Sequence, residues 1–310
     1  MQNKNSQKPK IICIGGPTGV GKTALAIKLA NLFDGEIISC DSIAIYRHLD
    51  IGSAKPDKTE QSQAKHYMID IKEPTEQFDM AEYRQMAKSI IKDILSRGKL
   101  PIIVGGTGLY MKGLLFPLEL GNSQRNDEIR EKYKKIADEQ GGEKLLEILK
   151  NVDPESALKL HPKDTLRIIR ALEIYELTGR KKSSIKTELV SEYDYMLIFL
   201  NDDRKELYAR IDNRVDKMMT LGLENEIQNL IKDYNLTAQN QSMQGIGYKE
   251  FFDYFDNKLS KDKLVETIKQ NSRHYAKRQI TWFKAMPNCS EYNCHNVEKI
   301  IEDAKYFLKK

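Results

Sequence analysis

The hydrophobic pattern of this 310-residue chain is a series of short apolar runs, each followed by a glycine-rich or polar turn and then by a segment of helical period. Apolar runs at residues 11–14, 36–40 and 100–104 suit buried strands of a parallel sheet. Strand character returns at residues 193–200, and a shorter strand-like piece covers residues 67–69. Strands that alternate with helices predict an α/β fold around a central parallel sheet.

Helical periodicity is clearest at residues 79–97, where Asp79 is suited to the N-cap. Further helices are expected at residues 203–219 and 260–285. Residues 43–56 follow neither period and end in turn residues. We therefore expect them to form an irregular loop with a functional role.

The composition changes after Pro117, and residues 122–185 hold charged helical segments without a convincing strand. We interpret this region as a helical insertion into the α/β fold. The chain then reads as a first part of the core at residues 1–120, an insertion domain at 121–190 and a second part of the core at 191–310.

The first strand runs directly into a phosphate-binding pattern, G-x-x-x-x-G-K-[ST], and a helix follows. Its glycines allow backbone N–H groups to surround phosphate oxygens, Lys22 would contact the terminal phosphate, and Thr23 would supply a hydroxyl ligand to Mg²⁺. The alternative is a glycine-rich turn without a ligand, which the joint presence of strand, spacing, Lys22 and Thr23 disfavours. The pattern predicts a phosphorylated ligand and leaves open whether it is a nucleotide. The predicted phosphate-binding residues are Gly16, Pro17, Thr18, Gly19, Val20, Gly21, Lys22 and Thr23.

Two further turns should share the same edge of the sheet, because functional groups gather beyond the carboxyl ends of parallel strands. Asp41 follows the second strand, although an aspartate there could also cap the next turn. Residues 105–108 form a second glycine-rich turn after a strand and would bring the Thr107 hydroxyl to the same ligand. Arg210 and Arg214 lie four apart on a predicted helix, as either a solvated face or a pair of anion clamps.

The helix expected at residues 260–285 carries a run of basic side chains with no acidic residue among them and with aromatic side chains interleaved. The basic residues are Lys269, Arg273, Lys277, Arg278 and Lys284, and the aromatic ones are Tyr275 and Trp282. This combination suggests contacts with a nucleic-acid backbone. The alternative is an ordinary solvated helix face.

Composition and charge constrain the class of protein less closely than these motifs do. The net charge of +5 and the pI near 8.7 permit a polyanionic partner without requiring one. No apolar run approaches the length of a membrane span, and the first ten residues lack the apolar core of a signal peptide, so a cytoplasmic location is expected. Cys289, Cys294 and His295 lie close together, but no fourth ligand follows at zinc-finger spacing, which favours a loop without metal.

Several unusual strings then occur in order along the chain. They are Gly16-Pro17-Thr18-x-x-Gly21-Lys22-Thr23, Asp41-Ser42-x-x-x-Tyr46, Gly52-Ser53-Ala54-Lys55-Pro56, Gly105-Gly106-Thr107-Gly108-Leu109-Tyr110 and Lys277-Arg278-Gln279-Ile280-Thr281-Trp282. Together they resemble the bacterial-type tRNA dimethylallyltransferases (isopentenyl-diphosphate:tRNA transferases), over essentially the whole chain. One departure is Ala44, where a Gln is frequent in the family, and this puts a side-chain contact from that position to the target base in question.

The resemblance implies a P-loop NTPase-like three-layer fold with a helical, tRNA-binding insertion. It implies transfer of a dimethylallyl group from dimethylallyl diphosphate to N6 of adenine 37, beside the anticodon, giving N6-dimethylallyladenosine and diphosphate. The expected partners are the tRNA anticodon stem-loop and the prenyl diphosphate, with Mg²⁺ as cofactor, no membrane, and a monomeric enzyme.

Asp41 is the candidate general base for the N6 proton. Lys22, Thr23 with Mg²⁺, Thr107 and an arginine would stabilise the departing diphosphate, and by resemblance that arginine is Arg214. The predicted catalytic residues are therefore Asp41, Thr107 and Arg214. By resemblance the tRNA contacts are Asp41, Ser42, Ile43, Ala44, Thr107, Arg130, Asp164, Thr165, Leu166, Arg167, Ile168, Gln244, Gly245, Ile246, Gly247, Tyr248, Lys249, Lys277, Arg278, Gln279 and Trp282.

Two other classes of protein are compatible with parts of the pattern. A P-loop small-molecule or nucleotide kinase would use the same loop and the same aspartate, and ATP turnover without tRNA would identify it. It leaves the basic and aromatic C-terminal helix unexplained. A non-enzymatic RNA-binding module would not need Lys22, Thr23 and Asp41 together. GTPase and motor ATPase functions are disfavoured because no Asn-Lys-x-Asp string follows.

Overall fold

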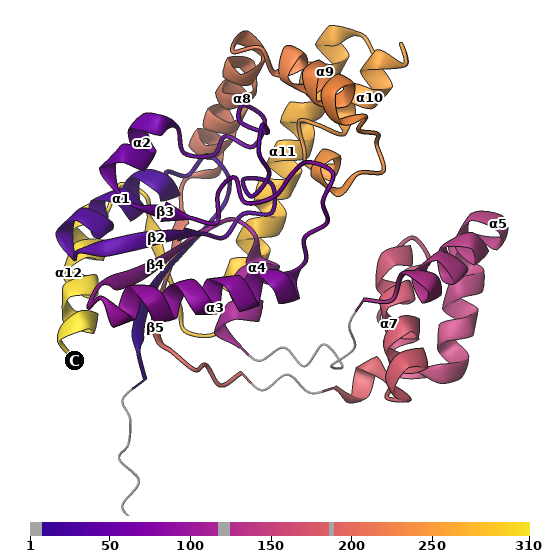
Figure 1. Ribbon diagram of the computed structural model, residues 1–310, viewed down its shortest axis with the longest axis horizontal. Coiled ribbons are helices and arrows are strands. Elements are labelled where there is room, and N and C mark those ends of the chain that lie inside the picture. The colour runs from indigo at the N-terminus through magenta and orange to yellow at the C-terminus, as the bar shows by residue number, and fades with distance from the viewer. Residues whose placement is uncertain (1–7, 117–124, 186–188) are drawn as a thin grey trace, which may run out of the picture. The chain divides into compact units, whose positions relative to one another are not determined.

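Six strands pair into one parallel sheet in the computed structural model, which describes residues 8–116, 125–185 and 189–310 (Figure 1). The strands are β1 (Lys10–Gly15), β2 (Gly35–Ser39), β3 (His66–Tyr67), β4 (Leu100–Gly105), β5 (Asp194–Asn201) and β6 (Cys289–Asn293). Their order is β3-β2-β4-β1-β5-β6, and every neighbouring pair is parallel. The predicted α/β fold with a central parallel sheet is confirmed.

β1 lies inside the sheet, where Ile12 pairs with Ile102 of β4 on one side and Met196 of β5 on the other. A parallel strand covered on both faces needs apolar side chains at every position, which explains the continuous apolar run that predicted it. Because all the strands are parallel, the loops that follow β1, β2 and β4 leave the sheet at one edge.

The chain divides into two compact units, a core unit (Met1–Leu115 with Ser191–Lys310) and an inserted unit (Phe116–Val190). The inserted unit comprises α5 (Asp127–Val152), α6 (Pro154–Leu158), α7 (Thr165–Thr178) and the 3-10 helix η1 (Lys182–Ser184). Leu145, Leu149 and Ile168 belong to its own buried cluster, so this unit has a hydrophobic core separate from that of the sheet. The predicted boundary at residue 121 lies outside the described residues.

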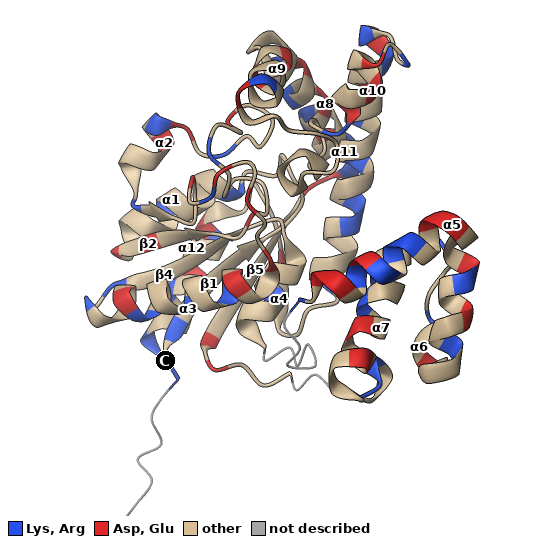
Figure 2. Cartoon of the chain, turned by 45° about the vertical axis from the view of Figure 1, so that its right-hand side comes forward, with Lys and Arg blue, Asp and Glu red and all other residues tan. Residues whose placement is uncertain are grey.

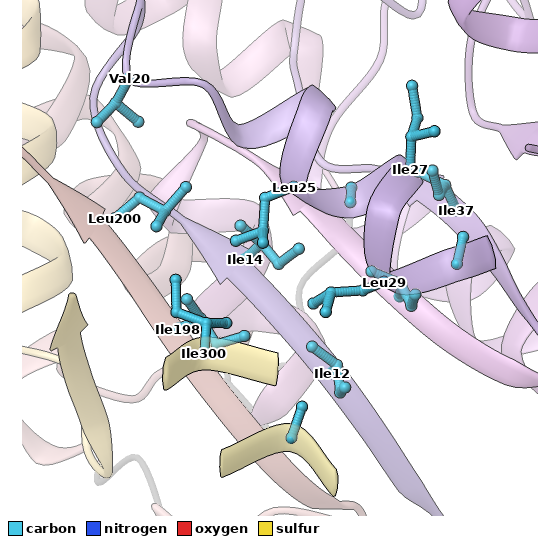
Figure 3. Close-up of a cluster of buried hydrophobic side chains, with 14 of the residues drawn as sticks. Ile12, Ile14, Val20, Leu25, Ile27, Leu29, Ile37, Ile198, Leu200 and Ile300 are labelled. Atoms are coloured by element: carbon cyan, nitrogen blue, oxygen red, sulfur yellow. The ribbon is translucent and has the colours of Figure 1, made fainter. Parts of the chain in front are cut away.

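The helices of the core unit flank the sheet on both faces (Figure 1). They are α1 (Lys22–Leu32), α2 (Lys58–Gln63), α3 (Met80–Ser96), α4 (Gly108–Leu115), α8 (Arg204–Thr220), α9 (Leu223–Tyr234), the 3-10 helix η2 (Gln241–Gln244), α10 (Glu250–Phe255), α11 (Lys261–Lys284) and α12 (Val297–Lys309). Leu25 and Leu29 of α1 and Ile300 of α12 pack into one buried cluster with Ile12 and Ile14 of β1 (Figure 3). That cluster fixes α1, and therefore the phosphate-binding loop before it, against the central strand.

Local signals place the predicted helices. The Asp79 carboxylate accepts hydrogen bonds from the N–H groups of Ala81 and Glu82, so it caps α3 as predicted. The Ser260 hydroxyl caps α11 in the same way by accepting from Lys263 N–H. Within the described residues, no helix combines the length and the apolar character that a membrane crossing would require.

Two predicted elements are wrong in detail. The strand expected at residues 67–69 is β3 at His66–Tyr67, because Met68 has a φ of 63° and cannot continue an extended strand. The loop expected around Cys289 is instead β6, in which Cys289 pairs with Leu197 of β5. The polar sequence of this edge strand hides it from a search for apolar runs.

Candidate active site

A cavity of about 500 Å³ lies at the carboxyl edge of the sheet, within the core unit. The loops that follow β1, β2 and β4 form part of its wall, and α8 and α11 form another part. The chemically active side chains that line it include Thr18, Lys22, Thr23, Asp41, Arg214 and Arg278. The structure therefore brings together the phosphate-binding loop, the Asp41 turn and the basic helix, which are far apart in the sequence.

The loop between β1 and α1 is held by its glycines and by the core. Gly16 has a φ of 147°, and a Cβ atom there would lie 2.4 Å from the carbonyl oxygen of Leu200, so only glycine fits. The side chain of Val20 is buried in the core cluster beside Leu200 (Figure 3). The Lys22 ammonium donates to the Pro17 carbonyl over 2.7 Å, which keeps it in the loop. Thus Thr18, Lys22 and Thr23 face the cavity while Val20 anchors the loop.

Asp41 combines the two roles that its position allowed. Its Oδ1 atom accepts hydrogen bonds from the N–H groups of Ile43 (2.8 Å) and Ala44 (3.2 Å), so it caps the turn that follows β2. Asp41 also lines the same cavity as Lys22. Its carboxylate is close enough to oppose the lowering of the pKa of both Lys22 and Arg214.

Burial in this cavity disfavours positive charge on two cations. Burial and the nearby Arg214 guanidinium lower the pKa of Lys22 to about 7. Burial also lowers the pKa of Arg214. Within the described residues Arg214 forms no ion pair, and its Nη2 donates to the Ser53 carbonyl over 3.3 Å. A bound anion would supply the negative charge that these two cations lack.

Arg210, the other member of the predicted pair, has a different task. Its Nε donates to the Gly19 carbonyl over 3.1 Å, and its guanidinium is paired with Asp202. Arg210 therefore braces the outside of the phosphate-binding loop, whereas Arg214 faces the cavity. Although the two side chains leave α8 four residues apart, the Arg210 guanidinium binds Asp202 and the Arg214 guanidinium binds the Ser53 carbonyl.

Thr107 ties the second glycine-rich turn to the Asp41 turn. Its Oγ1 accepts from Ser42 N–H over 3.2 Å, and its own N–H donates to the Cys40 carbonyl over 3.2 Å. The hydroxyl predicted to contact the ligand thus has a partner in the loop after β2. These two hydrogen bonds hold the Asp41 turn in place.

Gln279, predicted as a tRNA contact, is buried and joins the two glycine-rich turns. Its Oε1 accepts from Thr18 N–H and its Nε2 donates to the Gly106 carbonyl, both over 2.9 Å. A Cβ atom on Gly106 would lie 2.1 Å from that Nε2, so glycine is required for this approach. These contacts make Gln279 a support for the phosphate-binding loop at the wall of the cavity.

The residues of the loop at 244–249 divide between the cavity wall and the protein interior. Gln244 and Lys249 are exposed and line the cavity, together with Gly245 and Ile246. Tyr248 is fully buried, and its hydroxyl donates to Glu226 over 2.8 Å. The side chain of Tyr248 therefore cannot contact tRNA as predicted. Glu226 was not singled out in the sequence, where it is one of several acidic residues on an amphipathic helix.

Most of the basic side chains in the run on α11 are neutralised by ion pairs with acidic residues of the core unit. Lys269 pairs with Asp216 over 2.7 Å, Arg273 with Asp212 over 2.7 Å, and Lys284 with Glu291 over 3.0 Å. By contrast, Lys277 and Arg278 are exposed, and Lys277 has no ion-pair partner in the described part of the chain. Figure 2 shows basic residues recurring along α11.

Two more side chains complete the exposed part of α11. The Arg278 guanidinium lies 5.6 Å from the centre of the Tyr275 ring and lines the cavity. Trp282 is 40% exposed, and a Cβ atom on Gly108 would lie 2.0 Å from its ring. Glycine at position 108 therefore allows the indole to pack against the start of α4 while one part of it stays accessible.

In the inserted unit, Arg130 is bound to a buried acid. Its guanidinium makes two hydrogen bonds to the Glu173 carboxylate, at 2.8 and 3.0 Å, and Arg170 makes a third at 2.6 Å. Although burial opposes ionisation, hydrogen bonds from Arg130, Asn126 N–H and Arg170 lower the pKa of Glu173 to about 2. Arg130, predicted to contact tRNA, thus stabilises this unit.

At the start of α7 the predicted tRNA contacts separate by burial. Leu166 and Arg167 are exposed, Leu166 to 82%. Asp164 and Thr165 are half-buried at the first turn. Ile168 is fully buried in the core of the unit, so a contact from its side chain to RNA is excluded in this structure.

Side-chain oxygen atoms that could ligate a metal ion line the same cavity as Lys22. Thr23 and Ser39 supply hydroxyl groups to the cavity wall, and Asp41 supplies a carboxylate. Mg²⁺ prefers such oxygen donors. The residues present therefore fit a magnesium ion beside the phosphate-binding loop.

A second group of possible metal ligands follows β6. Ligand atoms of Asp202, Cys294 and His295 lie within 4.8 Å of one another, and Cys289 is not part of this group. The Arg210 guanidinium donates to Asp202 and lies 3.8 Å from the Cys294 sulfur. Its positive charge opposes a cation at that place.

Comparisons with known proteins extend over most of the chain. The IPP transferase family matches residues 44–286. A tRNA dimethylallyltransferase of Caldanaerobacter subterraneus subsp. tengcongensis is 49% identical over an alignment of 284 residues that covers 89% of this chain and 89% of that protein. The crystal structure of a tRNA delta(2)-isopentenylpyrophosphate transferase from Staphylococcus epidermidis aligns with a TM-score of 0.71 and 39% identity, covering 97% of this chain and 99% of the other. A eukaryotic dimethylallyltransferase acting on tRNA aligns with a TM-score of 0.80 and 30% identity, covering 96% and 77%.

Proposed function

This chain belongs to the IPP transferase family, and from that premise we propose that it transfers a dimethylallyl group from dimethylallyl diphosphate to a tRNA. The acceptor atom in this proposal is N6 of adenine 37, beside the anticodon. The products are N6-dimethylallyladenosine and diphosphate. The chain acts as a monomer.

The observation that carries the proposal is that one cavity is lined by an acid, Asp41, and by two cations without acidic partners, Lys22 and Arg214. In the reaction the C1–O bond of the prenyl diphosphate breaks and a bond forms between C1 and N6. The bonding electrons of the C1–O bond leave with the diphosphate. The N6 amine loses one proton to the Asp41 carboxylate as general base.

The bonds to Asp41 support this role. Its Oδ1 is held by the N–H groups of Ile43 and Ala44, which fixes the plane of the carboxylate. The other oxygen, Oδ2, then takes the N6 proton. A carboxylate held in this way needs no reorganisation when the amine attacks, which lowers the barrier.

Lys22 and Arg214 stabilise the negative charge that grows on the departing diphosphate. The N–H groups of the phosphate-binding loop and the start of α1 act in the same direction. Thr23 and Ser39 would hold Mg²⁺, which supplies further electrostatic stabilisation of the leaving group when bound.

Recognition of tRNA rests on exposed side chains in both units. Lys277 and Arg278 on α11 supply positive charge for the phosphate backbone, and Trp282 offers an accessible ring for stacking. In the inserted unit, Leu166 and Arg167 are accessible at the start of α7. An adenine in a single-stranded anticodon loop leaves its stack at low cost, so it can enter the cavity.

The experiment that tests the proposal supplies labelled dimethylallyl diphosphate or γ-labelled ATP in parallel, with and without unmodified tRNA. Label in tRNA from the prenyl donor alone is the expected result. Transfer of the ATP label to another acceptor, with none from the prenyl donor, would identify the P-loop kinase alternative instead.

A further inference from the structure

A single carboxylate on α9 holds the loop that forms one wall of the cavity. Glu226 accepts hydrogen bonds from three successive N–H groups: Asp50 at 2.9 Å, Ile51 at 2.7 Å and Gly52 at 3.2 Å. Successive backbone N–H groups that converge on one anion form a concave nest, which here is filled by the protein's own side chain. The irregular loop predicted at residues 43–56 thus has a defined support.

Tyr248 extends this support by one residue. Its hydroxyl donates to Glu226 over 2.8 Å and accepts from Ser53 N–H over 3.0 Å. Burial, reinforced by the Glu226 carboxylate, raises the pKa of Tyr248, so the phenol stays protonated and donates at neutral pH. A Cβ atom on Gly52 would lie 2.5 Å from the Tyr248 ring, so the loop passes this ring at a distance that only glycine allows.

The opposite side of the same loop faces the cavity. The Ser53 carbonyl accepts from Arg214 Nη2 over 3.3 Å, and residues 52–56 line the cavity wall. The N–H and C=O groups of Ser53 therefore connect Tyr248 to Arg214 through one residue. One guanidinium donor of Arg214 is occupied by Ser53, and its planar shape then fixes the directions of the remaining donors.

We propose that Glu226 and Tyr248 are positioning residues that fix the loop at residues 50–53 and, through the Ser53 carbonyl, orient Arg214 toward the departing diphosphate. This inference rests on the proposed function, because the diphosphate is what Arg214 is oriented toward. Neither residue touches the substrate. Their effect is on the geometry of a buried cation, where a displacement of about 1 Å can reduce the rate about a hundredfold.

The test is a double-mutant cycle between this pair and Arg214, measured as the single-turnover rate of dimethylallyl transfer at saturating substrates. Glu226→Gln and Tyr248→Phe should each lower the rate by about tenfold to a hundredfold, with tRNA affinity unchanged. In an Arg214→Ala background the same changes should have almost no further effect, because the group that they orient is absent. Glu224→Gln is the matched control on the same helix, since Glu224 pairs with Lys261 away from the loop.

Each outcome decides the inference. Equal losses in the presence and absence of Arg214 would overturn it, and so would wild-type rates in both positioning variants. Tyr248→Phe removes only a hydroxyl, so it keeps the test decisive if thermal melting shows Glu226→Gln to be unfolded. Affinity for inorganic diphosphate, measured by calorimetry, gives a readout that does not depend on transfer. If the wild-type enzyme transfers no prenyl group, the proposed function fails, whereas a loss of diphosphate affinity that depends on Arg214 would still support the positioning role.

Discussion

Asp41 and Lys22 line one cavity although they follow strands that are not neighbours in the sheet. Lys22 follows β1 and Asp41 follows β2, with β4 lying between these strands. The turn after β4 is bonded to the turn after β2, because Thr107 accepts a hydrogen bond from Ser42 N–H. The Thr107 bond therefore ties the Asp41 turn to the end of the strand that lies between the two residues.

The first prediction separates the two roles of Asp41. Asp41→Asn keeps an oxygen that can accept from Ile43 and Ala44 but removes the base, so the single-turnover rate should fall by about a hundredfold or more. Asp41→Ala removes the cap as well and should also lower the melting temperature. Affinity of Asp41→Asn for tRNA, measured by filter binding, should stay within about twofold of wild type, because this substitution removes only a proton acceptor. A near-normal rate in Asp41→Asn would remove this residue as the base.

The sheet and the phosphate-binding loop could be predicted because each depends on local sequence. Ile12 and Ile14 lie in an uninterrupted apolar run, and the spacing of Gly16, Lys22 and Thr23 directly encodes the loop geometry. β6 could not be predicted in the same way, and the short β3 was predicted with the wrong bounds. Cys289 starts an edge strand whose side chains are partly exposed and mostly polar, so it carries no apolar signal.

The site was harder to predict because burial of individual polar residues depends on distant partners. By resemblance Gln279 and Tyr248 are tRNA contacts, yet both side chains are buried and bonded to other parts of the protein. Their partners, Gly106 and Glu226, are on other elements and are set by the tertiary fold. The same holds for Lys269, whose charge is matched by Asp216 on α8. Sequence spacing defined a basic stripe, but only the packing of α8 against α11 shows which cations are left accessible.

The second prediction uses this difference along α11. Lys277→Ala should weaken tRNA binding and reduce the magnitude of the salt-dependence slope by about 1, because one phosphate contact is lost. Lys269→Ala is the matched control on the same helix and should leave the slope unchanged, since its ammonium is already paired with Asp216. Binding measured across a salt titration distinguishes the two. If the salt-dependence slope of Lys277→Ala equals that of Lys269→Ala, Lys277 makes no phosphate contact.

The third prediction concerns Arg130 in the inserted unit. Arg130→Met leaves the buried Glu173 with fewer donors and should destabilise this unit by about 1–3 kcal/mol. Hydrogen exchange of α5 and α7 amides reports this directly. Lys135→Met is the matched control, because Lys135 is exposed on the same helix with only a 3.8 Å surface pair to Glu139.

Acid provides an independent check of the same ion pair. The pKa of Glu173 is lowered from 4.5 to about 2, so its contribution to stability is complete above pH 4.5 and is lost as the pH falls toward 2. Arg130→Met should make the inserted unit less sensitive to this acid range than wild type. An unchanged acid transition would show that Arg130 does not stabilise the Glu173 carboxylate.

The last prediction follows from the pKa of Lys22, which burial and Arg214 lower to about 7. Below that pH the ammonium is already charged, so diphosphate affinity should not depend on its titration. Above it the free enzyme loses the proton, and a bound anion restores it, because negative charge raises the pKa of a nearby amine. Binding should therefore take up a proton, and affinity should fall by at most about tenfold per pH unit as the pH rises. Calorimetry of inorganic diphosphate in two buffers of different ionisation enthalpy measures this uptake. Lys22→Arg is the control, since a guanidinium stays charged and the ligand's own protons are common to both proteins. The same proton uptake in both proteins would place the titrating group elsewhere than on Lys22.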